Sequence, residues 1–262
     1  IEIVRGCGRQ CRFCVADYAR RWPRHRSVEN TLQLAEKARG ITDRIGLVGA
    51  SISDHPQIDE IATGLVDRGF RISCASLRAE TVRAPLLDAL AESEQGTITI
   101  APEVASENLQ QVVNKAIPRE RLYYVFEEAL KRDILNLRLY FLIGVPYETS
   151  ADVDAIVDMA KDMRSILLPY AKRTGRMGRI SFTISPMVPK PHTPFQWTEM
   201  ADQKTIARKL EFLKREINKL GGLKVSSASA RLAYQEGVFA RGDRRLGRII
   251  LDLSRGVAWK HA

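Results

Sequence analysis

The chain has 262 residues, of which 45% are hydrophobic, and its 41 Lys and Arg residues outnumber its 31 Asp and Glu residues, which gives a net charge of +10 at pH 7. This length and apolar content allow a substantial buried core. The sequence has no apolar run of about 18 residues, the length that a membrane-spanning helix needs. We therefore expect a cytoplasmic protein without membrane association. The positive charge favours anionic partners, although nucleic-acid binding is only weakly supported because many of the charges fall on amphipathic helical patterns.

Short apolar runs alternate with longer helical patterns, which predicts parallel strands joined by right-handed crossovers. The expected strands are Ile1–Val4, Ile45–Val48, Phe70–Cys74, Thr97–Ala101, Leu137–Ile143 and Ile180–Ile184. The expected helices are Ser27–Arg39, Gln57–Arg68, Ala79–Ala91, Arg119–Lys131, Ala151–Tyr170 and Asp202–Leu220. Six βα units form either an open doubly wound sheet or an incomplete TIM-like barrel, and in both the reactive groups follow the carboxyl ends of the strands.

The expected domain organisation is a catalytic barrel over residues 1–222, followed by a basic C-terminal extension over residues 223–262. The sequence pattern does not define the structure of that extension. Because the chain starts inside an expected strand without an initiating Met, we expect further sequence before Ile1.

Cysteine is concentrated after the first expected strand, where Cys7, Cys11 and Cys14 lie within eight residues, and Cys74 stands alone. Such clustering is typical of metal ligands rather than of a disulfide framework. Three thiolates on one loop can hold a cubane cluster and leave one iron without a protein ligand, so that an exogenous molecule can bind there and be reduced.

Two alternatives for the cluster remain open at this point. A structural zinc site would need a fourth ligand, such as His25 or Cys74, although zinc sites generally use paired C-x-x-C motifs. A ferredoxin-like carrier would need a fourth local cysteine. The simplest interpretation of Cys74 is a small buried hydrophobic residue.

The loop from Cys7 to Cys14, with its C-x-x-x-C-x-aromatic-C spacing, resembles the signature of the radical S-adenosylmethionine (SAM) superfamily. The resemblance implies an α/β fold, an incomplete TIM-like barrel of about six parallel βα units known as the radical SAM core. It also implies a 4Fe-4S cluster on Cys7, Cys11 and Cys14, whose open iron binds SAM. In that family, electron transfer cleaves SAM into methionine and a 5′-deoxyadenosyl radical that abstracts hydrogen from a substrate. A reductant such as flavodoxin or ferredoxin is implied as a partner.

Further motifs extend the resemblance and imply SAM-binding residues. Phe13 takes the position that flanks the adenine. Gly49 retains one glycine of a Gly-Gly-Glu motif, Arg78 ends a Ser-Leu-Arg segment, and Glu103 follows the fourth strand, where the family contacts the ribose or amino group. Ile143 precedes a Gly-x-Pro-x-Glu-Thr segment whose apolar neighbours pack on adenine. Structural interpretations are also available, including a strand-to-loop bend at Gly49 and solvated side chains at Arg78 and Glu103.

A proline-rich segment after the sixth strand, residues 185–197, contains His192, a candidate for acid–base chemistry or for a hydrogen-bonded structural role. This segment resembles radical SAM cores that follow a cobalamin-binding domain, which would lie outside this chain. The substrate is unidentified, with an anionic substrate as one option. The other candidate functions are a methylthiotransferase-like modifier of RNA or protein, and a non-enzymatic metal-binding module.

Overall fold

The computed structural model describes residues 1–20 and 22–259, in which strands and helices alternate along the chain. The strands are β1 (Glu2–Arg5), β2 (Arg24–His25), β3 (Arg44–Gly49), β4 (Arg71–Cys74), β5 (Thr97–Glu103), β6 (Asn136–Ile143), β7 (Ile180–Pro186) and β8 (Leu223–Ser227). The α-helices are α1 (Val15–Ala19), α2 (Val28–Glu36), α3 (Ile58–Val66), α4 (Ala84–Glu92), α5 (Glu107–Val113), α6 (Arg119–Lys131), α7 (Ser150–Thr174), α8 (Gln203–Lys219), α9 (Ala230–Arg241) and α10 (Leu246–Ser254). Short 3-10 helices, η1 (Ile52–Asp54) and η2 (Pro194–Trp197), lie in the connections.

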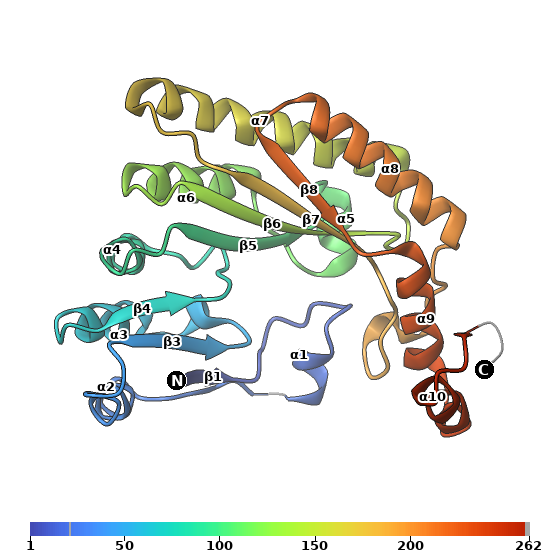
Figure 1. Ribbon diagram of the computed structural model, residues 1–262, viewed down its shortest axis with the longest axis horizontal. Coiled ribbons are helices and arrows are strands. Elements are labelled where there is room, and N and C mark those ends of the chain that lie inside the picture. Colours follow the sequence, from blue (N-terminus) through green and yellow to red (C-terminus); the bar gives the residue numbers. More distant parts are fainter. Residues whose placement is uncertain (21, 260–262) are drawn as a thin grey trace.

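The strands form a fan that runs from β1 to β8 without closing on itself (Figure 1). β1, β3 and β4 are parallel neighbours, as are β5, β6, β7 and β8. A parallel bridge between Leu77 and Ile100 joins the two groups. The parallel strands follow one another in space in chain order, without the reversal that a doubly wound sheet requires, and the short β2 pairs antiparallel with β1 at the edge. The fold is therefore an incomplete TIM-like barrel, which confirms the predicted α/β class.

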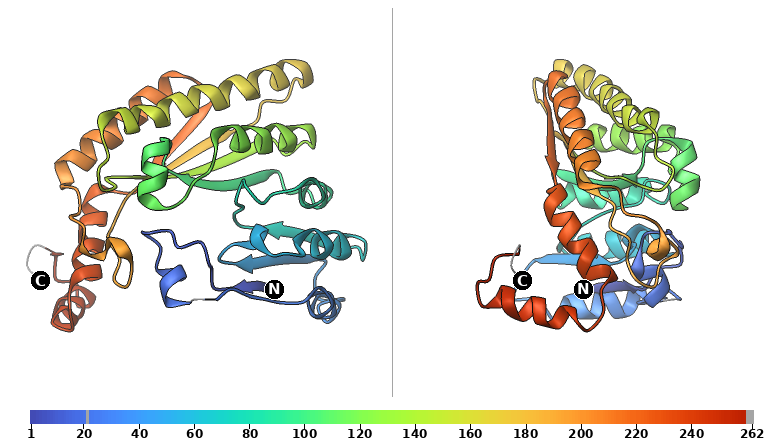
Figure 2. Two further views of the ribbon diagram at one scale, coloured as in Figure 1. Left: turned by 180° about the vertical axis from the view of Figure 1, so that it is seen from behind. Right: turned by 90° about the vertical axis from the view of Figure 1, so that its right-hand side faces the viewer.

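One face of the sheet packs into the main hydrophobic core. Side chains at alternate positions of β6 and β7 are at most 1% exposed, namely Leu137, Leu139, Phe141, Ile180, Phe182 and Ile184. The rings of Phe141 and Phe182 are stacked with centroids 5.9 Å apart. Burial of one such side chain contributes about 1.5–3 kcal/mol. α7 and α8 lie side by side at the same end of the molecule as these strands, which Figure 2 shows from two directions.

The expected strands are all present, and the structure adds elements that the sequence analysis did not predict. β8 pairs in parallel with β7, so the sheet continues past the boundary expected at residue 222. α9 and α10 occupy most of the remaining expected extension, whose last three residues, 260–262, lie outside the described part. The helix expected from Ala79 begins only at Ala84. Residues 79–81 form a turn instead, and Pro85, which is favoured in the first turn of a helix, lies in the first turn of α4.

None of the helices in the described part of the chain has the length and apolar character that crossing a bilayer would require.

Candidate active site

The three clustered cysteines lie on the loop between β1 and α1, at the carboxyl end of β1. Cys11 is 5% exposed, Cys7 and Cys14 are half-buried, and all are free thiols. Gly6 opens the loop with φ +85°, and a Cβ at this position would lie 2.5 Å from the Arg20 carbonyl oxygen. The backbone therefore turns at Gly6 in a way that only glycine permits.

The buried carboxylate of Asp17, in α1, fixes the shape of this loop. It accepts hydrogen bonds from the backbone N–H of Cys11 at 3.1 Å and of Arg9 at 3.2 Å. Asp17 is 3% exposed, so these bonds form away from bulk water, where an unpaired donor or acceptor is costly. The loop geometry thus depends on a carboxylate that the sequence analysis did not identify.

The same loop is anchored to α5 and to the proline-rich segment. The backbone N–H of Arg12 donates to the Val113 carbonyl at 3.0 Å, and its carbonyl accepts from the Phe195 N–H at 3.2 Å. Asn114 caps α5 in a left-handed conformation, with φ +53°, and its side-chain amide donates to the Gln10 carbonyl at 2.9 Å. The fold therefore brings residues from two distant parts of the sequence to the cysteine loop.

Burial has the largest effect on the pKa of the Cys7 and Cys11 thiols. It raises the pKa of Cys7 to about 12, together with a hydrogen bond to Asp17. Burial also raises the pKa of Cys11, against the opposing positive charges of Lys115 and Arg78. Such thiols are protonated at neutral pH and are not activated nucleophiles, whereas coordination to a metal deprotonates a thiol outright. Metal ligation by Cys7 and Cys11 would therefore release their protons.

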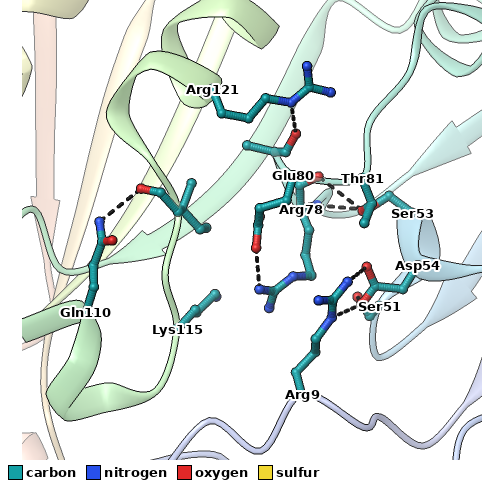
Figure 3. A network of polar contacts seen from close by, with 12 residues as sticks. Arg9, Ser51, Ser53, Asp54, Arg78, Glu80, Thr81, Gln110, Lys115 and Arg121 are labelled. Atoms are coloured by element: carbon teal, nitrogen blue, oxygen red, sulfur yellow. Dashed lines mark hydrogen bonds and ion pairs between the residues drawn. The ribbon is translucent and has the colours of Figure 1, made fainter. Parts of the chain in front are cut away.

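A polar network follows the carboxyl ends of β3 and β4 (Figure 3). The Arg78 guanidinium donates through Nη2 to Glu80 Oε1 at 2.5 Å, and the backbone N–H of Arg78 donates to Ser53 Oγ at 2.9 Å. Arg78 Nε and Glu80 Oε2 are both buried and have no hydrogen-bond partner within the described residues. Buried polar atoms are nearly always paired, so these two point to a missing polar ligand.

A second ion pair connects this network to the cysteine loop. Arg9 makes a bidentate contact with Asp54, with distances of 2.8 and 2.6 Å, and Ser51 Oγ donates to the same carboxylate at 2.6 Å. Burial alone would raise the pKa of Asp54, but the hydrogen bonds from Arg9 and Ser51 outweigh it and lower the pKa. Asp54 therefore holds the loop after β1 against the loop after β3 in its ionised form.

Glu103 ends β5 at an irregularity in the pairing with β6, with φ +69°. Its Oε1 accepts from Lys115 Nζ at 2.8 Å, and both side chains are largely buried, with exposures of 13% and 10%. Glu103 Oε2 has no hydrogen bond within the described residues. A left-handed conformation at a non-glycine residue is strained and is found preferentially at functional sites.

Phe13 packs on a small apolar cluster beside the main core, formed by Val104, Leu109, Val113, Val145, Met187 and Phe195. Leu142 of β6 packs against the same cluster, whereas the neighbouring Ile143 is 0% exposed and lies in the main core. Because successive strand side chains point to opposite faces, the apolar side chain that β6 presents to the Phe13 side is Leu142. The Ile143 side chain has no surface free for a ligand.

The structure separates the two remaining predicted residues from this network. Gly49 lies against β1, and a Cβ there would come within 2.8 Å of the Val4 carbonyl oxygen, so close strand packing requires glycine. His192 is exposed in the proline-rich segment with φ +60°, and its backbone N–H donates to Gln196 Oε1 at 3.2 Å. No hydrogen bond involves the His192 imidazole in the described part of the chain.

Within residues 1–20 and 22–259, no three His, Cys, Asp or Glu side chains are grouped as a site for one metal ion. A single zinc ion needs all its ligands around one centre, whereas a cubane spreads its thiolates over different irons. The zinc alternative therefore gains no support from the side-chain arrangement. Three free thiols on one loop, next to unpaired polar atoms, fit a cluster that carries a polar ligand.

Comparison with known proteins establishes the family. A model described as the radical SAM superfamily matches residues 1–160. The chain belongs to the radical SAM superfamily. It is 30% identical over 257 residues to the uncharacterised protein MJ0966 of Methanocaldococcus jannaschii, a match that covers 97% of this chain and 54% of that protein. A tRNA-2-methylthio-N(6)-dimethylallyladenosine synthase of Carboxydothermus hydrogenoformans is 22% identical over 193 residues, 67% of this chain and 43% of the synthase.

Solved radical SAM structures share the fold. The methyltransferase TsrM of Kitasatospora setae, determined with cobalamin and a [4Fe-4S] cluster, has a TM-score of 0.59 at 15% identity over 74% of this chain and 38% of that chain. The cobalamin-dependent enzyme OxsB has a TM-score of 0.57 at 17% identity, covering 81% of this chain and 35% of that chain.

Membership of the superfamily makes this chain an enzyme core whose cofactors are a 4Fe-4S cluster and SAM. The chain spans about half the length of the curated relatives that it matches, 54% and 43% in the two cases above. The general reaction, reductive cleavage of SAM, follows from the family. The substrate and the partners are proposed below.

Residues that the sequence analysis missed are Asp17, Arg9, Asp54, Glu80 and Lys115. Asp17 follows Cys14 by three residues, but nothing in the sequence shows that its side chain turns back to the loop. The Arg9–Asp54 pair joins two different βα units, so it becomes visible only when the strand ends are brought together. The Glu103–Lys115 pair forms within the connection from β5 to α6 and depends on how that segment turns.

Proposed function

We propose that Cys7, Cys11 and Cys14 hold the 4Fe-4S cluster and that the chain cleaves SAM reductively to act on an organic substrate. The observation that carries this proposal is the position of the cysteine loop: Asp17 shapes it, and the Arg9–Asp54 ion pair joins it to strand ends that carry unpaired buried atoms at Arg78 and Glu80. When bound, the reduced cluster supplies the electron that converts SAM to methionine and a 5′-deoxyadenosyl radical.

The polar and apolar residues around the loop match the chemical groups of SAM. The Arg78 Nε–H suits the SAM carboxylate, and Glu103 Oε2 suits an ammonium or ribose hydroxyl donor. Lys115 orients the Glu103 carboxylate through its 2.8 Å contact. Phe13 offers an apolar face to the adenine, and Gly49 offers backbone groups at the end of β3. Ile143 would contribute through its backbone, since its side chain is fully buried.

His192 is proposed to contact the substrate, since its exposed imidazole stands in a segment that Phe195 ties to the cysteine loop. An imidazole carries both a donor and an acceptor nitrogen, which suits acid–base work on a substrate. A flavodoxin or ferredoxin is the proposed electron donor, and the cytoplasm is the proposed location.

Two candidate reactions have separate support. A cobalamin-linked reaction is favoured by the likeness of the fold to TsrM and OxsB, with cobalamin held by a domain outside residues 1–262. A methylthiotransferase-like modification of RNA or protein is favoured by the similarity to the tRNA-modifying synthases. Hydroxocobalamin binding by the full-length protein distinguishes them, because only the first reaction requires it.

Cluster ligation is tested by anaerobic reconstitution of Cys7→Ala, Cys11→Ala and Cys14→Ala, with Cys74→Ala as the matched control. Cys74 is also buried but lies in β4, away from the loop. Each loop variant should lose most of its iron and the change that SAM causes in the electron paramagnetic resonance spectrum of the reduced wild type. Full iron content in any loop variant, or loss in Cys74→Ala alone, would overturn the ligand assignment.

A further inference from the structure

The interior face of the sheet contains a hollow of about 740 Å³ next to the first halves of β6, β7 and β8. Two rows of side chains cross it, because residues paired in register lie side by side on parallel strands. One row is Arg138, Ser181 and Lys224, and the next is Tyr140, Thr183 and Ser226. Arg179 lies at the open end, where its backbone N–H donates to Asn136 Oδ1 at 3.0 Å. We call this the inner-face hollow.

The charges in the inner-face hollow are all positive. Its lining residues include Arg138, Arg179 and Lys224 but neither Asp nor Glu. None of these three cationic side chains has a hydrogen bond or ion pair within residues 1–20 and 22–259. By contrast, several basic side chains on the outer surface are neutralised, as in the pairs Arg71–Asp43 and Lys161–Asp158. Unpaired cations in a concave site concentrate positive potential and attract anions.

The polar interior departs from the usual content of this fold. A closed TIM barrel fills its interior with branched apolar side chains that form a packed core. Here the opposite face of the same strands supplies the apolar core, and the interior positions of β6 to β8 present hydroxyl, phenol, ammonium and guanidinium groups. Such groups donate hydrogen bonds to water or to an oxyanion but cannot form an apolar core.

We propose that the inner-face hollow binds the phosphate or pyrophosphate end of an elongated small-molecule substrate. Its volume is in the range of small-ligand pockets, and of its lining residues only Tyr140 is aromatic, whereas single-stranded RNA sites stack successive bases on several aromatic rings. Arg138 lies five residues before Ile143, the last residue of β6. At a rise of about 3.3 Å per residue, Arg138 is about 16 Å from the carboxyl end of the strand. The substrate therefore spans on the order of 15 Å between its anionic end and its reacting carbon near the cysteine loop. Naming this ligand as the substrate rests on the proposed function.

Binding of inorganic pyrophosphate to the anaerobically reconstituted protein tests the site by isothermal titration calorimetry. The double variant Arg138→Gln/Lys224→Gln removes two lining cations. The control Lys172→Gln/Arg231→Gln makes the same change in net charge at exposed positions of α7 and α9. We expect the lining variant to weaken binding by about 10- to 100-fold and the control to bind as the wild type does. Equal binding by all three proteins, or equal weakening in both variants, would overturn the site, provided that thermal melts show folded proteins.

A second arm uses a 12-nucleotide single-stranded RNA. Tighter binding of RNA than of pyrophosphate, with the same dependence on Arg138 and Lys224, would contradict a small-molecule site. SAM cleavage by the wild type separates the two proposals. If the wild type cleaves SAM but its pyrophosphate binding does not depend on the hollow, the inference fails alone. If pyrophosphate binds as expected but SAM is not cleaved, the anion site stands and the proposed function, with the substrate assignment, fails.

Discussion

The carboxylate of Asp17 accepts a hydrogen bond from the backbone N–H of Cys11 at 3.1 Å, inside a loop of three cysteines. A second bond, from the Arg9 N–H at 3.2 Å, uses the other carboxylate oxygen. One buried side chain therefore holds two backbone donors in the segment that we propose to wrap the cluster. The geometry of the cysteine loop therefore depends on Asp17, although Asp17 is not itself a proposed cluster ligand.

Asp17→Asn should lower the iron content of the reconstituted protein. An amide has one acceptor oxygen, so one of the two buried N–H groups faces an NH₂ group, at a cost of about 1–3 kcal/mol. Iron and sulfide per chain are the measurement, and Asp67→Asn, at an exposed position, is the control. Wild-type iron content and cluster stability in Asp17→Asn would contradict a role for this carboxylate in the loop.

Gly6→Ala should abolish cluster assembly, whereas Gly40→Ala should not. Both glycines have φ +85°, so both substitutions carry the conformational strain of about 1–2 kcal/mol. A Cβ at Gly6 also meets the Arg20 carbonyl oxygen at 2.5 Å, while a Cβ at Gly40 meets nothing within 4 Å. The difference in iron content between the two variants isolates the effect of this contact. Similar iron content in both would show that the close approach is unimportant.

Glu103→Gln and Arg78→Met should weaken SAM binding by about 10- to 100-fold, because each removes a charge-assisted hydrogen bond to the ligand. Both variants should keep most of their iron, since neither side chain is a proposed ligand. Equilibrium dialysis with labelled SAM gives the dissociation constants, and Arg44→Met, at an exposed site in β3, is the control. Unchanged SAM affinity would remove that residue from the proposed SAM site.

His55 should remain neutral below the pH at which an exposed histidine becomes charged. Burial lowers its pKa below 6.5. Its Nδ1 accepts from the Gln57 N–H at 3.0 Å, so the ring proton is on Nε2 and donates to the Arg26 carbonyl at 2.8 Å. The unfolded state binds a proton at His55 more readily than the folded state does. The contribution of neutral His55 to the free energy of unfolding is therefore fully present above pH 6.5 and is lost as the pH falls towards the pKa of the folded state.

Nitrogen-15 chemical shifts of the imidazole, followed from pH 8 to pH 5, check both parts of this expectation. A titration midpoint at or above 6.5 would contradict the neutral buried ring, and an Nδ1–H tautomer would contradict the hydrogen-bond assignment.

Sequence periodicity predicted the parallel strands because their apolar positions are buried in one continuous core, as at Leu139 and Phe182. It missed β8, where exposed Lys224 and Ser226 interrupt the apolar run of an edge strand. The cysteine loop was recognisable because its residues are adjacent in the chain. The Glu103–Lys115 pair was not, because its geometry depends on the turn after β5. Ile143 was assigned from its motif, but strand alternation buries its side chain and turns Leu142 towards Phe13.

The most direct test of the central claim is the formation of 5′-deoxyadenosine. The reconstituted protein is reduced with dithionite in the presence of SAM, and the products are separated by chromatography, with Cys11→Ala and Cys74→Ala assayed beside the wild type. We expect 5′-deoxyadenosine from the wild type and from Cys74→Ala, and none above background from Cys11→Ala. A wild-type protein that assembles a stable cluster but neither binds nor cleaves SAM would contradict the account.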